Sequence, residues 1–174
     1  GPAPAPPCGG CECGSGRRTG CVRAVREGDA VAGNDIEAAI FGTAVGMCNT
    51  GQPTEGGHGL HMRAMNRVRA AGSIDAAGAS GLIKSGIMHA LVTQGKKFVL
   101  VGSVRDDGPL PDVHTDVIEG QRAMRAQLEG VGFCLMLAPM LHSVAPGKIL
   151  PAPIPLVCGD LNQATHTTPA PTRS

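Results

Sequence analysis

Three short apolar segments limit the folds open to this chain more than any other feature. They are Lys97–Val104 (KFVLVGSV), Phe133–Ala138 (FCLMLA) and Pro155–Leu161 (PLVCGDL). None of them alternates apolar with polar residues, and such runs are typical of parallel strands that are covered on both faces. The sequence therefore predicts an α/β fold, with a buried parallel sheet and helices packed against it.

Helical periodicity is found in the segments before these strands. A helix capped by Asn34 or Asp35 is predicted to end at Phe41, where a glycine follows. Residues 58–71 and 81–94 each place apolar residues at helical spacing, and each is also followed by a glycine. These segments are expected to form the helical layers of the α/β fold.

A further helix is predicted between the first two strands. It begins at Asp112 or Asp116 and ends near Leu128. Its inward-facing residues are expected to be Val117, Ile118, Met124 and Leu128. The crossover from Val104 to Phe133 is expected to be right-handed, as such connections between parallel strands nearly always are.

Glycine and proline divide the chain into three parts. There are 26 glycines and 14 prolines, and many of them lie in residues 1–21 with four of the cysteines. Residues 1–21 and the tail 163–174 contain few residues that could enter a core, so both are predicted to be poorly ordered. The α/β domain is expected to span residues 22–162.

Composition excludes several classes of function. The net charge is +1, and the chain has three Phe but no Trp or Tyr, which leaves neither a strong basic field nor aromatic platforms for nucleic acid. The longest apolar run, Val131–Leu141, is too short to span a membrane. No secretion signal is evident, and the number of cysteines, seven, is odd, so a reducing, cytoplasmic location is predicted.

Polar residues follow each predicted strand, where ligands bind in open parallel sheets. Asp106 and Asp107 follow the first strand, His142 follows the second and Asp160 ends the third. Asp160 is placed to accept the ribose hydroxyls of a dinucleotide or to cap a turn. The aspartate pair fits a tight turn or a ligand contact, and His142 fits an acid/base group or a loop histidine.

Two familiar binding patterns are incomplete. The N-terminal glycines do not give GxGxxG and follow no strand, so a dinucleotide would need another phosphate cradle. CxxCxC and HxxH patterns offer a lesser alternative, a zinc-binding module, although no second CxxC completes it. The residues of this alternative are Cys8, Cys11, Cys13, His58 and His61.

Longer strings identify a family resemblance. Gly102–Asp112 (GSVRDDGPLPD) and Leu135–Ser143 (LMLAPMLHS) resemble the C-terminal region of the archaeal-type ornithine cyclodeaminases. That family includes the cyanobacterial bifunctional arginine dihydrolase/ornithine cyclodeaminases, and its members are also described as LOR/SDH-like. Gly33–Gly57, Ala71–Ile74, Lys84–Met88 and Val157–Asn162 extend the similarity, which covers about residues 22–165.

The resemblance implies a fold, a cofactor and a reaction. It implies a Rossmann-like, deoxyhypusine-synthase-like NAD-binding domain from an enzyme that converts L-ornithine to L-proline and ammonia. NAD is then a catalytic hydride carrier, ornithine is the partner molecule, and the full-length family members are expected to be homo-oligomers. The resemblance identifies no catalytic acid or base in this chain.

The resemblance also implies which residues contact NAD. They are Asp29, Ala30, Asp107, Pro139, Met140, Leu141, His142 and Asp160. Asp29 stands where the family has Asn, and its carboxylate would repel a pyrophosphate. Pro139 stands where Ser or Ala is usual, which removes a backbone N–H donor.

Both ends of the chain depart from the family pattern. Gly1-Pro2-Ala3 resembles only the end of the family's first nucleotide-binding strand, and the family's closing strand and helix have no counterpart after Ala164. The sheet is therefore expected to be incomplete at both ends and the chain to be a fragment of the enzyme. The alternative is a degenerate, non-catalytic α/β fragment that acts at most as an assembly surface.

Overall fold

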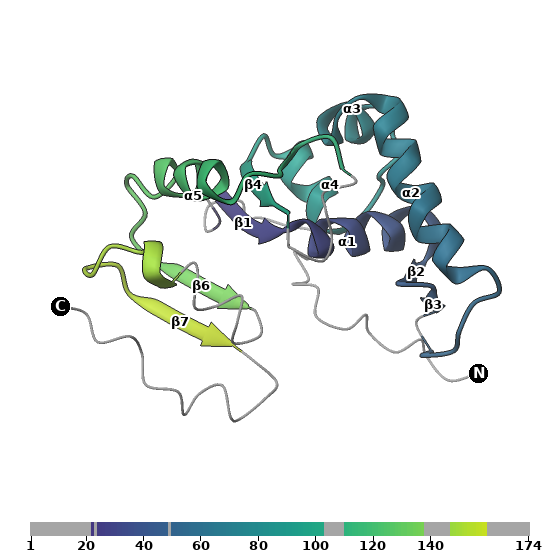
Figure 1. The fold of residues 1–174 in the computed structure, drawn as a ribbon, viewed down its shortest axis with the longest axis horizontal. Coiled ribbons are helices and arrows are strands. Elements are labelled where there is room, and N and C mark those ends of the chain that lie inside the picture. The colour runs from purple at the N-terminus through teal and green to yellow at the C-terminus, as the bar shows by residue number, and fades with distance from the viewer. Residues whose placement is uncertain (1–21, 23, 49, 103–109, 138–146, 160–174) are drawn as a thin grey trace. The chain divides into compact units, whose positions relative to one another are not determined.

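The structure of the protein is a computed structural model (Figure 1). It describes residues 22, 24–48, 50–102, 110–137 and 147–159. The chain divides into two compact units, Gly1–Gly120 and Gln121–Ser174. Each unit is described by itself.

A parallel sheet of three strands organises the first unit. Strand β4 (Lys97–Val101) lies between β1 (Ala24–Gly28) and β5 (Val113–His114). Gly28 pairs with Val101, which in turn pairs with His114. The carboxyl ends of all three strands therefore lie side by side, which confirms the predicted parallel arrangement.

Burial explains why β4 is the central strand. Val99 and Leu100 point to opposite faces of the sheet, and they are only 6% and 0% exposed. The prediction of a strand covered on both faces is confirmed for β4. The strand ends at Val101 rather than Val104, because its pairing partners β1 and β5 end there.

Helices pack against this sheet and against one another. Helix α1 (Asp29–Phe41) contacts β1, β4, α2 (Gly57–Ala71) and α4 (Gly86–Thr93), and α3 (Ile74–Ala79) contacts α2 and α4 (Figure 1). The side chains between them form the core. Its members include Ala32, Ile36, Ala64, Met65, Val68, Ile74, Ile83, Met88 and Leu100.

The first helix begins earlier than predicted. Strand β1 leads directly into α1 at Asp29, so Asp35 lies inside the helix and the prediction that Asn34 or Asp35 caps it is wrong. Asp35 instead accepts hydrogen bonds from the backbone N–H groups of Ile87 at 2.9 Å and Met88 at 2.8 Å. Through these two hydrogen bonds, the Asp35 carboxylate in α1 caps the first turn of α4 and links the two helices.

The other helices of this unit differ in how well they match the prediction. Helix α2 begins one residue before the predicted segment 58–71 and ends at its last residue. Segment 81–94 is helical only within α4, and α3 was not predicted. Ser73 begins α3 by accepting from the N–H of Ala76 at 2.9 Å, a local capping signal present in the sequence.

Helix α5 (Val117–Ala126) begins after Asp116, which accepts from the N–H groups of Ile118 and Glu119. The prediction that Val117 and Ile118 face inward is wrong, because they are 57% and 62% exposed. Gly120 makes the close contact instead: a Cβ there would lie 2.7 Å from Cγ2 of Val101. A helix that approaches a strand through glycine leaves no apolar signal at that position.

The second unit contains a pair of parallel strands, β6 (Cys134–Leu137) and β7 (Leu156–Gly159). Met136 is only 7% exposed, but Leu135 and Leu137 are 53% and 59% exposed. The prediction of a strand buried on both faces is therefore wrong for β6 among the described residues. The two strands form a sheet of their own within this unit.

Several sequence predictions lie beyond what the structure describes. Residues 1–21 and 163–174 are outside the described residues, and the domain limits 22–162 stay a prediction. The hand of the crossover from Val104 to Phe133 also stays a prediction, because it joins the two units. No helix in the described ranges is long and apolar enough to cross a membrane.

Candidate functional site

In the first unit, a candidate position for ligand binding is the carboxyl end of β1. Asp29 and Ala30 follow this strand directly and form the first turn of α1, next to the carboxyl end of β4. Asp29 is 3% exposed, whereas Ala30 is exposed. Asp107, which follows β4, is outside the described residues.

In the second unit, a candidate position for ligand binding is the carboxyl end of the β6–β7 pair. Leu137 and Gly159 pair with each other, so the chain leaves both strands at neighbouring points. The predicted contacts that follow these strands lie outside the described residues; they are Pro139, Met140, Leu141, His142 and Asp160. Each predicted NAD contact thus follows a parallel strand at its carboxyl end, where ligands of such sheets bind.

The start of α1 has the chemistry that a dinucleotide needs. Gly28, its N-cap, has no side chain to cap the N–H groups of the first turn, and such groups with the helix dipole bind anions. The carboxylate of Asp29 opposes a phosphate there but suits ribose hydroxyls, which donate to it. The uncapped N–H groups at this helix start therefore fit the anionic part of a dinucleotide.

A titratable carboxyl group lies one residue before this turn. Burial, and then the charge of Asp35, raise the pKa of Glu27 to about 7. Its Oε1 is buried and has no hydrogen-bond partner among the described residues. Glu27 could not be predicted as a site residue, because nothing in the segment AVREG indicates that β1 is a strand or that Oε1 of Glu27 is buried.

A second carboxylate, Glu37, is fully buried in α1 and is surrounded by donors. It accepts from Oγ1 of Thr43 at 2.8 Å and from the N–H groups of Val45 and Gly46, both at 3.0 Å. Nδ1 of His61, in α2, lies 2.8 Å from Oε2 of Glu37. Burial by itself would raise the pKa of Glu37, but these hydrogen bonds outweigh it and hold the pKa below its usual value.

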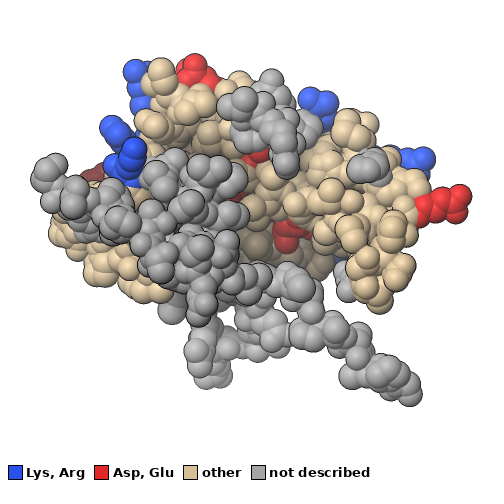
Figure 2. Space-filling model, turned by 60° about the horizontal axis from the view of Figure 1, so that its bottom comes forward, with Lys and Arg blue, Asp and Glu red and all other residues tan. Residues whose placement is uncertain are grey.

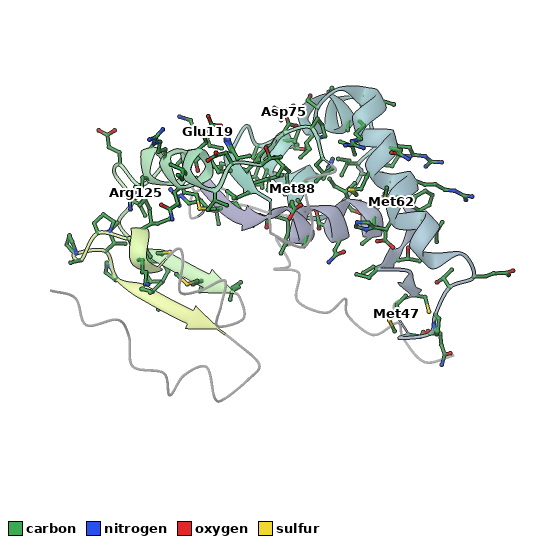
Figure 3. All side chains as sticks on the ribbon, in the orientation of Figure 1. Met47, Met62, Asp75, Met88, Glu119 and Arg125 are labelled. Atoms are coloured by element: carbon green, nitrogen blue, oxygen red, sulfur yellow. The ribbon has the colours of Figure 1, made fainter. Side chains whose placement is uncertain are left out.

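Three of these donors, Thr43, Val45 and Gly46, come from a tight hairpin that contacts α2. It consists of β2 (Thr43–Ala44), β3 (Met47–Cys48) and the turn Val45–Gly46 between them. Figure 3 labels Met47 in the hairpin and Met62 in α2. Val45 has a φ of 52°, which is strained for a β-branched residue, so the turn is held in place by its contacts.

His61 was a predicted zinc ligand, and the structure shows one of its ring nitrogens bonded to Glu37. The cysteines of the zinc alternative lie outside the described residues. Among the residues that are described, no group of three or more His, Cys, Asp or Glu side chains could hold a metal ion. Figure 2 shows Lys and Arg side chains near the edges of the face in view.

Comparison with known proteins identifies the family. Residues 17–171 match the family of the C-terminal, Rossmann-fold domain of ArgZ-like arginine dihydrolases. The chain is 45% identical to the ornithine cyclodeaminase of Methanopyrus kandleri, over 86% of this chain and 37% of that protein. It is 43% identical to the bifunctional arginine dihydrolase/ornithine cyclodeaminase AgrE of Nostoc, over 86% of this chain and 22% of that protein.

A solved structure agrees with this result. The ternary complex of AgrE with ornithine and NAD+ matches 83% of this chain and 21% of that one, at 43% identity and a TM-score of 0.77. The chain spans 37% or less of the curated relatives that it matches here. The predicted Rossmann-like fold and the predicted resemblance are confirmed: the chain belongs to the family of ArgZ-like C-terminal Rossmann-fold domains.

Proposed function

We propose that the chain binds NAD+ at the carboxyl ends of its parallel strands, as part of an enzyme that converts L-ornithine to L-proline and ammonia. The observation that carries this proposal is the position of the expected contacts. Asp29 and Ala30 follow β1, Asp107 follows β4, and the remaining contacts follow β6 and β7. The relative AgrE, solved with ornithine and NAD+, supports this choice of ligands.

Each part of the site has a distinct task in this proposal. Asp160 accepts hydrogen bonds from ribose hydroxyls, whereas Asp29, Ala30 and residues 139–142 supply the other expected contacts with the cofactor. Bound NAD+ supplies a hydride acceptor that later returns the hydride. The protein orients the cofactor and the substrate. Its side chains also accept the protons that the substrate amine releases when it is oxidised to an imine.

Binding of the reduced cofactor tests this proposal. The chain has no Trp, so the fluorescence of NADH can be followed without interference from indole. Wild-type protein should enhance NADH fluorescence, and NAD+ should displace NADH. Asp160→Ala should weaken binding about tenfold or more, because a carboxylate that accepts hydrogen bonds is lost.

A matched variant controls for charge. Asp75→Ala removes an exposed carboxylate on α3 and should leave the affinity unchanged. If millimolar NAD+ neither displaces NADH nor raises the thermal midpoint of the wild-type chain, the proposal is wrong.

A second candidate function is a non-catalytic assembly surface. The exposed apolar side chains of the β6–β7 pair favour it, since Leu135, Leu137 and Val157 are each at least 50% exposed. In this case the Asp160→Ala substitution should change nothing, and Leu135→Ser should lower the mass measured by analytical ultracentrifugation.

A further inference from the structure

The buried carboxylate Glu37 determines which nitrogen of His61 carries a proton. An ionised carboxylate only accepts hydrogen bonds, so Nδ1 of His61 must donate to it across the 2.8 Å contact. In the neutral imidazole, Nε2 then bears a lone pair. No described residue hydrogen-bonds to Nε2, and the His61 side chain is 30% exposed.

Glu37 has more hydrogen-bond partners than are needed to hold the hairpin in place. Thr43, Val45 and Gly46 already supply three donors to Glu37. His61 adds a fourth from α2, and its half-exposed ring gains a fixed orientation. A carboxylate that orients a histidine and stabilises its protonated form is a recurrent arrangement in proton transfer.

The ring lies close to the proposed cofactor edge. Asp29, Gly33 and Glu37 follow one another at intervals of four residues, so they share one face of α1. A Cβ on Gly33 would lie 3.2 Å from Cε1 and 3.7 Å from Nε2 of His61, which shows that the ring rests on this glycine. Gly33 is about 6 Å along the helix from Asp29.

We propose that Nε2 of His61 binds an ammonium group of the amino-acid substrate and takes a proton from it. This inference rests on the function proposed above. The N–H bond of the ammonium breaks and an H–Nε2 bond forms, which leaves a neutral amine with a lone pair. The positive charge moves to the imidazole, where it faces the carboxylate of Glu37. A neutral amine is the form that can lose a hydride from its carbon to become an imine.

Nitrogen NMR of the wild-type protein observes this proton directly. In protein labelled with 15N-histidine and saturated with NAD+, L-ornithine should move the Nε2 resonance of His61 to the protonated position. Pentanoate, which keeps the carboxylate but has no amine, should leave the resonance unmoved. An equal response to pentanoate, or no response to ornithine, overturns the proposal.

Calorimetry of a variant provides a second readout. His61→Gln keeps a donor near Glu37 but has no basic nitrogen, and it should weaken ornithine binding about tenfold or more. Its NAD+ affinity should stay within about twofold of wild type, because the cofactor contacts are intact. His89→Gln, which alters another half-buried histidine in α4, should change neither affinity.

The possible failures are distinguishable. If the wild-type chain does not bind NAD+, the proposed function fails and this inference fails with it. If NAD+ binds and His61→Gln binds ornithine as tightly as wild type does, only the role of His61 is wrong. Should the variant not fold, the resonance of His61 in the wild-type protein decides alone.

Discussion

Glu27 and Glu37 lie in adjacent elements, the strand β1 and the helix α1, and both carry carboxyl groups away from solvent. Glu37 accepts hydrogen bonds from four groups, and its pKa lies below the usual value despite complete burial. Glu27 has a buried oxygen without such a partner, and burial raises its pKa to about 7. Donors around the carboxylate, rather than burial, therefore decide which group is ionised at neutral pH.

Replacement of Glu37 should have the largest effect on stability. Glu37→Gln puts an NH2 group among donors that need an acceptor, so it should lower the free energy of unfolding at pH 7 by about 3 kcal/mol. Urea denaturation measures this change. Glu55→Gln, at an exposed position, is the matched control and should have almost no effect. A loss below about 1 kcal/mol would mean that the cluster holds the fold only weakly.

Replacement of Glu27 should act in the opposite direction. Its folded pKa of about 7 exceeds its ordinary pKa of 4.5, so the folded state binds more protons between these values. The free energy of unfolding of the wild type should therefore fall as pH rises from about 4.5 to about 7. Glu27→Gln should remove this loss and stabilise the protein at pH 8 by about 2 kcal/mol, with little change at pH 4.5.

Thermal unfolding across this pH range measures the effect. If the free energy of unfolding of Glu27→Gln fell with pH as steeply as that of wild type, the raised pKa of Glu27 would be wrong.

For Glu37, whose pKa is lowered, the pH dependence of stability has the opposite sign. Its contribution is present above the unfolded pKa and is lost as pH falls through the folded one, so acid should weaken the hairpin contact.

The hairpin turn offers a smaller test of the same comparison. Gly46 donates to Glu37, has a φ of 73° and lies so close to α2 that a Cβ would be 2.6 Å from the carbonyl carbon of Gly57. Gly42 has the same φ, but no atom lies within 4 Å of its added Cβ. Gly46→Ala should therefore destabilise the protein by at least about 1 kcal/mol more than Gly42→Ala. Equal losses would show that backbone strain alone matters.

The sequence predicts those helices and strands whose apolar pattern and end signals lie within their own segments. Helix α2 has helical apolar spacing and a following glycine, and β4 is a short run of apolar residues. The prediction that Asp35 caps its own helix is wrong, because its partners, Ile87 and Met88, are more than fifty residues away in the chain. Gly120 and β1 were missed because neither shows an apolar pattern.

In the candidate site, too, residues with a local sequence signal could be predicted and a contact between distant residues could not. Polar residues after strands predicted the carboxyl edge, and the family resemblance added Asp29 and Ala30, which the structure places at the end of β1. The contact between Glu37 and His61 joins residues that are 24 positions apart. Neither residue type at its own position indicates that contact, so only the packing of α1 against α2 reveals it.

Backbone NMR with NAD+ tests the central claim, that the cofactor binds at the carboxyl ends of the parallel strands. The account predicts that NAD+ shifts the amide resonances of Asp29, Ala30 and Gly102, at the carboxyl ends of β1 and β4. The amides of Ala24 and Lys97, at the opposite ends of these strands, should not move. Shifts confined to Ala24 and Lys97, or no shifts at millimolar NAD+, would contradict the account.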